Sequence, residues 1–255
     1  MISEETIRII SHRLVNENIC RIPLDDSSLG IIDEYMRYIR SESDLCRRLS
    51  DIELNYVQIS SESQTATESS SEVNEMLKKH LRELTDSWSS KGVLRDFVFS
   101  YNEEEIEYIK YSYSNLLEFM RDAQNIITEH LMTISETAAQ IRACSASFTE
   151  VYKESKLAVY AAMLNRNVQD VLDCRAVSLQ AHASANECER YSSRLLGAAR
   201  NCTRIISVIN KLIINTSETL GFEYDKRIIH PNSAYNAICE AITALDNKNS
   251  KFSII

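Results

Sequence analysis

The sequence predicts an all-α fold: an elongated antiparallel three-helix coiled-coil bundle with short extra helices at each end. The 255 residues include only four Gly and two Pro, whereas sandwiches, barrels and doubly wound sheets need many turns built from these residues. Apolar residues also recur at heptad spacing through three long stretches. With 44% apolar and 25% charged residues, the chain has the composition of a folded protein with a buried core.

The first expected element is a short amphipathic helix over residues 3–18. Ser3 can cap its N-terminus, and Ile7, Ile10 and Leu14 share one face. Pro23 and the Asp-Asp-Ser-Ser run that follows then end this helix and supply the cap of the next one.

The first long helix is expected from about residue 29 to residue 90. Its heptad positions are Tyr35, Ile39, Leu45, Leu49, Ile52, Tyr56, Ile59, Ala66, Val73, Leu77, Leu81, Leu84 and Trp88. Eight of the twelve residues from Ser60 to Ser71 are Ser or Thr, so this stretch is either a loop between two helices or a weakly apolar part of one. We favour one helix, because the heptad frame resumes in phase at Val73.

The second long helix is expected over about residues 103–164, where the heptad pattern is strongest. Its seam is Ile106, Ile109, Tyr113, Leu116, Met120, Ala123, Ile127, Leu131, Ile134, Ala138, Ile141, Cys144, Phe148, Val151, Ala158 and Ala162. The polar residues 165–167 separate it from the third helix.

The third seam is Val168, Leu172, Leu179, Leu195, Ala199, Cys202, Ile206, Ile209, Ile213 and Leu220. Gly221 stands where a C-capping glycine would end this helix. After Pro231, Ser233 to Asp246 are expected to form a last short helix, with Tyr235, Ile238, Ile242 and Leu245 on one face.

Motifs of enzyme chemistry are absent from the sequence. It contains no Gly-rich phosphate loop, and none of its five His belongs to H-E-x-x-H or E-x-x-H. We therefore expect no catalytic residues, no cofactor and no metal. Seven scattered Cys without a C-x-x-C pair favour a reduced compartment. The net charge of -9 argues against nucleic-acid binding, and no run of 18 apolar residues predicts a membrane span.

Positive charge is concentrated on the third helix. Residues 150–215 carry nine basic and six acidic groups in an otherwise acidic chain. The basic stripe, opposite the apolar seam on a helical wheel, is Arg190, Arg194, Arg200, Arg204 and Lys211. Lys153, Lys156 and Arg166 add charge around the hairpin between the second and third helices. These eight are candidate lipid-binding residues for an anionic membrane surface. The alternatives are a solvated helix face, or a face that pairs with the acidic first helix.

The order and lengths of these helices resemble a BAR domain, most closely the sorting-nexin type, over residues 30–220. The resemblance uses the opening Ile32–Ile39 with Leu45 and Leu49, Asp96-Phe97-Val98 before the second helix, and near-matching helix lengths. It implies a cytoplasmic, peripheral homodimer that binds phosphoinositide or phosphatidylserine membranes. Such proteins sense or generate curvature in endocytosis and vesicle trafficking. The implied organisation is an N-terminal helix and linker at 1–24, the BAR-like domain at 25–221, and a short helix and tail at 222–255.

Two features depart from the sorting-nexin pattern. The basic cluster at the hairpin is sparser, and only about 28 residues precede the first long helix, too few for a PX-like region. A coiled-coil scaffold or cytoskeletal adaptor that binds proteins and not lipid is therefore the second hypothesis. An α-helical pore-forming or effector protein ranks lower, because the apolar runs are short.

Overall fold

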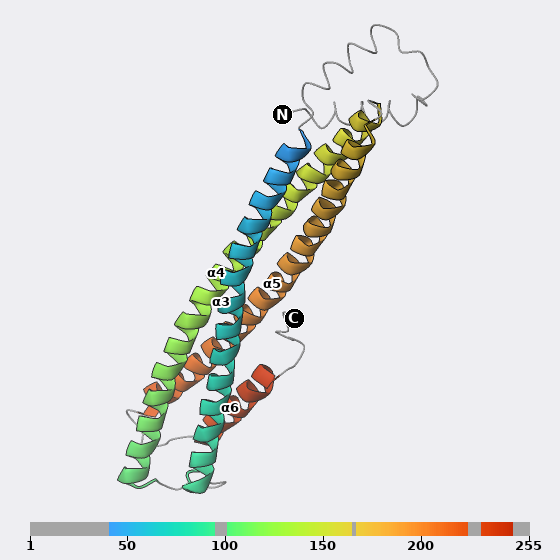
Figure 1. Ribbon diagram of the computed structural model, residues 1–255. Helices are drawn as coiled ribbons and strands as arrows, with labels where there is room; N and C mark the ends of the chain where they lie inside the picture. Colours follow the sequence, from blue (N-terminus) through green and yellow to red (C-terminus); the bar gives the residue numbers. More distant parts are fainter. Residues whose placement is uncertain (1–40, 95–100, 165–166, 224–230, 247–255) are drawn as a thin grey trace. The chain divides into compact units, whose positions relative to one another are not determined.

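The computed structural model describes residues 41–94, 101–164, 167–223 and 231–246. They form the helices α3 (Glu42–Ser90), α4 (Glu103–Leu164), α5 (Val168–Glu223) and α6 (Pro231–Asp246) (Figure 1). The predicted all-α fold with three long helices and a short C-terminal one is confirmed. The helix expected at 3–18 and the start of the first long helix at 29–40 lie outside the described residues.

Local sequence explains where α3 begins and ends. The Ser41 hydroxyl oxygen accepts the backbone N–H of Asp44 at 3.3 Å, which is an N-cap contact. At the other end, Gly92 has φ of 64°, a conformation that glycine adopts without a steric penalty. The N–H of Val93 donates to the Trp88 carbonyl at 3.1 Å, and that of Gly92 to Ser89 at 3.2 Å. This is a Schellman motif, which satisfies the last carbonyls of the helix.

The N-termini of α4 and α5 are capped by asparagines. Asn102 and Glu105 form a reciprocal capping box, in which each backbone N–H donates to the other side chain, at 3.0 and 2.8 Å. Asn167 accepts the N–H of Asp170 at 3.3 Å. The acidic run that opens α4 therefore fits the positive end of the helix dipole.

The chain divides into two compact units. Unit 1 contains residues 1–54 and 145–186, and unit 2 contains residues 55–144 and 187–255. In each unit, α4 runs antiparallel to both α3 and α5 (Figure 1). The polar contacts between helices that show this are Arg48–Glu154 and Ser145–Ala185 in unit 1, and Ser70–His130 and Ala138–Ser192 in unit 2.

The Ser/Thr-rich stretch 60–71 is continuous helix, as predicted. Ala66 is buried, and so are the polar residues Ser63, Thr67 and Ser70. Each of these three hydroxyls donates to a backbone carbonyl three or four residues earlier, at 2.8 to 2.9 Å. A buried hydroxyl whose hydrogen bond is satisfied within its own helix costs little. The helix therefore continues through a stretch with few apolar residues.

Asn74 continues this polar side of α3, but its amide is not satisfied in the same way. Its side chain is buried, and its Oδ1 atom has no hydrogen-bond partner among the described residues. Because a buried polar group without a partner is destabilising, Asn74→Leu is expected to raise the free energy of unfolding by about 1–2 kcal/mol. Urea denaturation monitored by circular dichroism measures this change. The exposed Asn115→Leu is the control, and a loss of stability for Asn74→Leu would show that the amide is satisfied in solution.

The predicted seams of α3 and α4 are largely confirmed, since most of their residues are buried. The first part of the α5 seam is wrong: Val168, Leu172 and Leu179 are 71%, 55% and 62% exposed. The buried residues there are Cys174, Val177, Ala181, Ala185 and Cys188. At about 100° per residue, Leu179 and Leu195 lie about 160° apart on the helix. The predicted seam therefore joined two opposite faces, and the structure buries the face of Leu195.

The end of α5 also differs from the prediction. The helix ends at Glu223, two residues beyond Gly221, so Gly221 does not terminate it. The last helix, α6, belongs to unit 2 and buries Ala234, Ile238, Ala241 and Leu245. Its apolar face is therefore a packing surface of unit 2.

Candidate lipid-binding surface

Seven of the eight predicted lipid-binding residues are described, and they belong to two different units. Lys153 and Lys156 belong to α4 in unit 1, and the five residues of the basic stripe belong to α5 in unit 2. Arg166 lies outside the described residues.

Three residues of the basic stripe, Arg190, Arg194 and Arg200, form an exposed basic surface on α5. These arginines are exposed because the core packs against a different face of α5. The buried residues of that face are Ser192, Leu195, Ala198 and Ala199. None of the three arginines makes an ion pair with any residue that the structure describes. No acidic residue occurs in the sequence from Arg190 to Ser217, and the nearest carboxylates on α5 are those of the exposed Glu187 and Glu189 just before Arg190.

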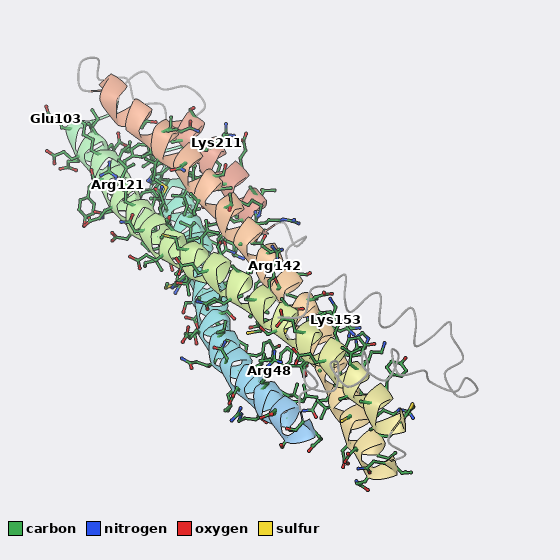
Figure 2. All side chains as sticks on the ribbon, turned by 90° about the horizontal axis from the view of Figure 1, so that it is seen from above. Arg48, Glu103, Arg121, Arg142, Lys153 and Lys211 are labelled. Atoms are coloured by element: carbon green, nitrogen blue, oxygen red, sulfur yellow. The ribbon has the colours of Figure 1, made fainter. Side chains whose placement is uncertain are left out.

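The other two residues of the basic stripe contact α6. Arg204 donates a hydrogen bond to the backbone carbonyl of Ala244, near the C-terminus of α6. Cations are stabilised at the negative end of a helix dipole. The Lys211 Nζ atom lies 3.6 Å from Glu240, with both side chains 73% exposed (Figure 2). Arg204 and Lys211 of the basic stripe are therefore in contact with α6.

Two cations of α3 hold the C-terminal residue of α6. The carboxylate of Asp246 lies 3.3 Å from the Lys78 Nζ atom and 2.6 Å from the Arg82 guanidinium. Burial by itself would raise the pKa of Asp246, but hydrogen bonds from Lys78 and Arg82 and their charges bring that pKa below its usual value. The α6 helix is therefore anchored by charge as well as by its apolar face.

The basic residues of α4 in unit 1 have acidic neighbours. Glu154 follows Lys153 directly in the sequence, and Glu150 lies one helical turn before it. Arg48 of α3 pairs with Glu154 and lies 3.7 Å from Glu150 (Figure 2). The Lys156 ammonium sits 4.8 Å from the centre of the Tyr152 ring. Its hydrogen bond with Tyr152 raises the pKa of Lys156, with burial opposing this. Lys156 thus stays charged, but the carboxylates reduce the positive potential around it.

The structure also brings together a Ser, a His and a Cys that the sequence did not mark as a site. Ser70 Oγ lies 3.1 Å from His130 Nδ1, and it also hydrogen-bonds the Cys202 thiol. The antiparallel register of the long helices does predict that His130 lies near residue 200. Ser70 and Cys202 are both fully buried, and burial raises the pKa of Cys202 although the Ser70 hydrogen bond lowers it. A protonated, buried thiol is a poor nucleophile, so we treat these residues as core packing.

Across the described ranges, no group of three or more His, Cys, Asp or Glu could hold a metal ion. None of the helices in those ranges contains a segment apolar enough to cross a membrane. No protein-family model, no curated protein and no solved structure matches the chain.

Proposed function

We propose that this chain is a non-enzymatic, dimeric protein that binds anionic phospholipid membranes and senses or generates curvature during membrane trafficking. The observation that carries the proposal is the exposed basic surface of Arg190, Arg194 and Arg200, which has no acidic partner among the described residues. The three long helices of 49, 62 and 56 residues support the resemblance to BAR domains, from which dimerisation and curvature are inferred.

The strength of membrane binding by this surface can be estimated from its charge. The negative potential of a phosphatidylserine or phosphoinositide membrane decays over about 8 Å at physiological ionic strength. Only basic groups that lie at the lipid headgroups therefore gain much energy. Each Lys or Arg placed there contributes about 1 kcal/mol. The three arginines together would strengthen membrane binding by about 3 kcal/mol, or a factor of about 100 in the dissociation constant.

A scaffold that binds only proteins is the alternative function. The observation that favours it is the exposed apolar row of Val168, Leu172 and Leu179 on α5, since exposed apolar patches often mark protein contacts. It predicts a specific protein partner and no salt-dependent binding to lipid vesicles.

Vesicle co-sedimentation tests the proposed function. The full chain is expected to bind vesicles that contain phosphatidylserine or a phosphoinositide, and not vesicles of phosphatidylcholine alone. A variant with Arg190→Glu, Arg194→Glu and Arg200→Glu is expected to bind about 100-fold more weakly or not at all. Raising the salt concentration should weaken binding of the unmodified chain, because salt screens the attraction.

A second triple variant controls for the change in net charge. It carries Arg47→Glu, Lys79→Glu and Arg121→Glu, which alter three other exposed residues by the same total charge. This control should keep most of the binding. Equal losses in the two variants would show that net charge, and not the surface on α5, determines binding. Light scattering measures the dimer separately, and a monomer at micromolar concentration would contradict that part of the proposal.

A further inference from the structure

The helix α6 is acidic, and both of its carboxylates contact basic residues of the long helices of unit 2. Its 16 residues include two acidic ones, Glu240 and Asp246, and no Lys or Arg. The Asp246 carboxylate contacts Lys78 and Arg82 of α3, at 3.3 and 2.6 Å. The Glu240 carboxylate lies 3.6 Å from the Lys211 Nζ atom of α5. Every formal charge on α6 therefore faces a cation of another helix.

The backbone at the C-terminal end of α6 contacts a further basic residue. The Ala244 carbonyl, in the last turn, accepts a hydrogen bond from the guanidinium of Arg204. The last carbonyls of a helix carry a partial negative charge, which a cation stabilises. Four cations from two helices therefore contact one short acidic helix, and these are Lys78, Arg82, Arg204 and Lys211.

The helix α6 lies antiparallel to α5, along one end of the basic stripe (Figure 1). Glu240 contacts Lys211. Ala244, four residues later in α6, contacts Arg204, which precedes Lys211 by seven residues in α5. The exposed arginines of the basic stripe end at Arg200, one helical turn before Arg204. The basic stripe is therefore continuous along α5, and α6 covers its C-terminal end.

The apolar attachment of α6 is small. Its buried apolar residues are Ala234, Ile238, Ala241 and Leu245, of which only Ile238 and Leu245 are large. A helix of 16 residues is marginally stable in water by itself, so its contacts with α3 and α5 hold it in place. Short elements with few buried apolar contacts open at a lower free energy than the core. Loss of its polar contacts would therefore release α6 before the three long helices separate.

Anionic lipid headgroups offer these cations the same chemistry as α6. The phosphates and carboxylates of a phosphatidylserine or phosphoinositide membrane accept charge-assisted hydrogen bonds from Lys and Arg, as the carboxylates of α6 do. A membrane that contacts Arg200 also brings headgroups close to Arg204, because residues four apart on a helix are separated by about 6 Å along its axis. The membrane and α6 therefore compete for the same basic residues.

We propose that α6 is a removable cover on the membrane-binding surface of unit 2, and that anionic lipid displaces it and binds the four cations beneath it. This role of α6 rests on the proposed function and regulates the same surface. With α6 in place, only the exposed arginines meet the headgroups and binding is weaker. Lys78 also contacts Glu75 within α3. The cations that should strengthen binding most after release are therefore Arg82, Arg204 and Lys211.

Hydrogen exchange of the unmodified full chain tests the displacement. Without lipid, the amides of α6 should be protected. On vesicles that contain phosphatidylserine they should exchange about tenfold faster, because α6 has left its site, whereas the amides of α4 in unit 2 should keep their protection. Vesicles of phosphatidylcholine alone should leave α6 unchanged. Unchanged exchange of α6 in a chain that binds the anionic vesicles would overturn the proposal and leave the proposed function in place.

Neutralising the two carboxylates of α6 should make it open more easily. Glu240→Gln and Asp246→Asn together preserve the size of both side chains and remove their attraction to the cations. We expect this double variant to bind phosphatidylserine vesicles about tenfold more tightly than the unmodified chain. Without lipid, its α6 amides should exchange faster, while those of α4 in unit 2 should not.

A second double variant separates the release of α6 from the change in net charge. Asp122→Asn and Glu129→Gln make the same change at two exposed positions of α4 in unit 2 and should leave the affinity and the exchange of α6 nearly unchanged. Equal gains in affinity for the two variants would contradict the proposal. If neither the unmodified chain nor the α6 variant bound anionic vesicles, the proposed function would fail and this role of α6 with it. Binding by the α6 variant alone would support both.

Discussion

Replacing Trp88 with Ala is expected to lower the free energy of unfolding by about 3–5 kcal/mol. The indole is fully buried, and its ring meets Tyr113 of α4 edge to face, with the ring centres 5.2 Å apart. Trp88 is also the residue whose carbonyl accepts the N–H of Val93 in the Schellman motif at the end of α3. The substitution therefore leaves a large cavity at the point where the chain leaves the helix.

Chemical denaturation followed by far-ultraviolet circular dichroism measures this loss. Tryptophan fluorescence cannot serve, because Trp88 is the only Trp of the chain. Trp88→Phe is the informative control, since it keeps an aromatic ring against Tyr113. It also removes a buried indole N–H that has no hydrogen-bond partner within the described residues. We expect it to cost less than about 1.5 kcal/mol. Equal losses for both variants would show that the cavity is not the cause.

Phe148→Ala should destabilise unit 1 by a similar amount, about 4–5 kcal/mol. Phe148 lies on α4 and is fully buried, and the inner residues of α5 in this unit are small, including Ala181 and Ala185. Large side chains can relax into a cavity, whereas alanines cannot reach across it. The helices themselves would have to move, so the cost should fall near the upper end of the range.

Hydrogen exchange measured by mass spectrometry shows which helices Phe148→Ala destabilises. In Phe148→Ala, the amides of α4 and α5 in unit 1 should exchange faster than in the unmodified chain. Phe148→Leu retains most of the volume and should cost about 1–1.5 kcal/mol. If Phe148→Ala left exchange in unit 1 unchanged, the side chain would not be part of its core in solution.

The helices were predictable because their signals are local. Heptad spacing and the scarcity of Gly and Pro identified α3, α4 and α5, and the second helix was predicted with the bounds that α4 has. The passage of α3 through residues 60–71 followed from the phase of the heptad at Val73. Side-chain hydroxyls that bond their own helix explain why so polar a stretch can remain helical.

The candidate surface was only partly predictable. The helical wheel placed Arg190, Arg194 and Arg200 away from the seam, as the structure does. It could not show that Arg204 and Lys211 contact α6, because those contacts join residues about 30 to 40 positions apart in sequence. Their formation depends on where the short helix packs, which no local pattern specifies.

By itself, the sequence determined that this protein is all-α, where its long helices lie, and that its positive charge is concentrated on the third of them. Each of these follows from residue type and spacing along one helix. Only the tertiary structure decided which face of α5 is inside, since Val168, Leu172 and Leu179 and the smaller Cys174, Val177 and Ala181 are both apolar rows of helical period. The row of smaller residues is the one that unit 1 buries, and the larger side chains remain exposed.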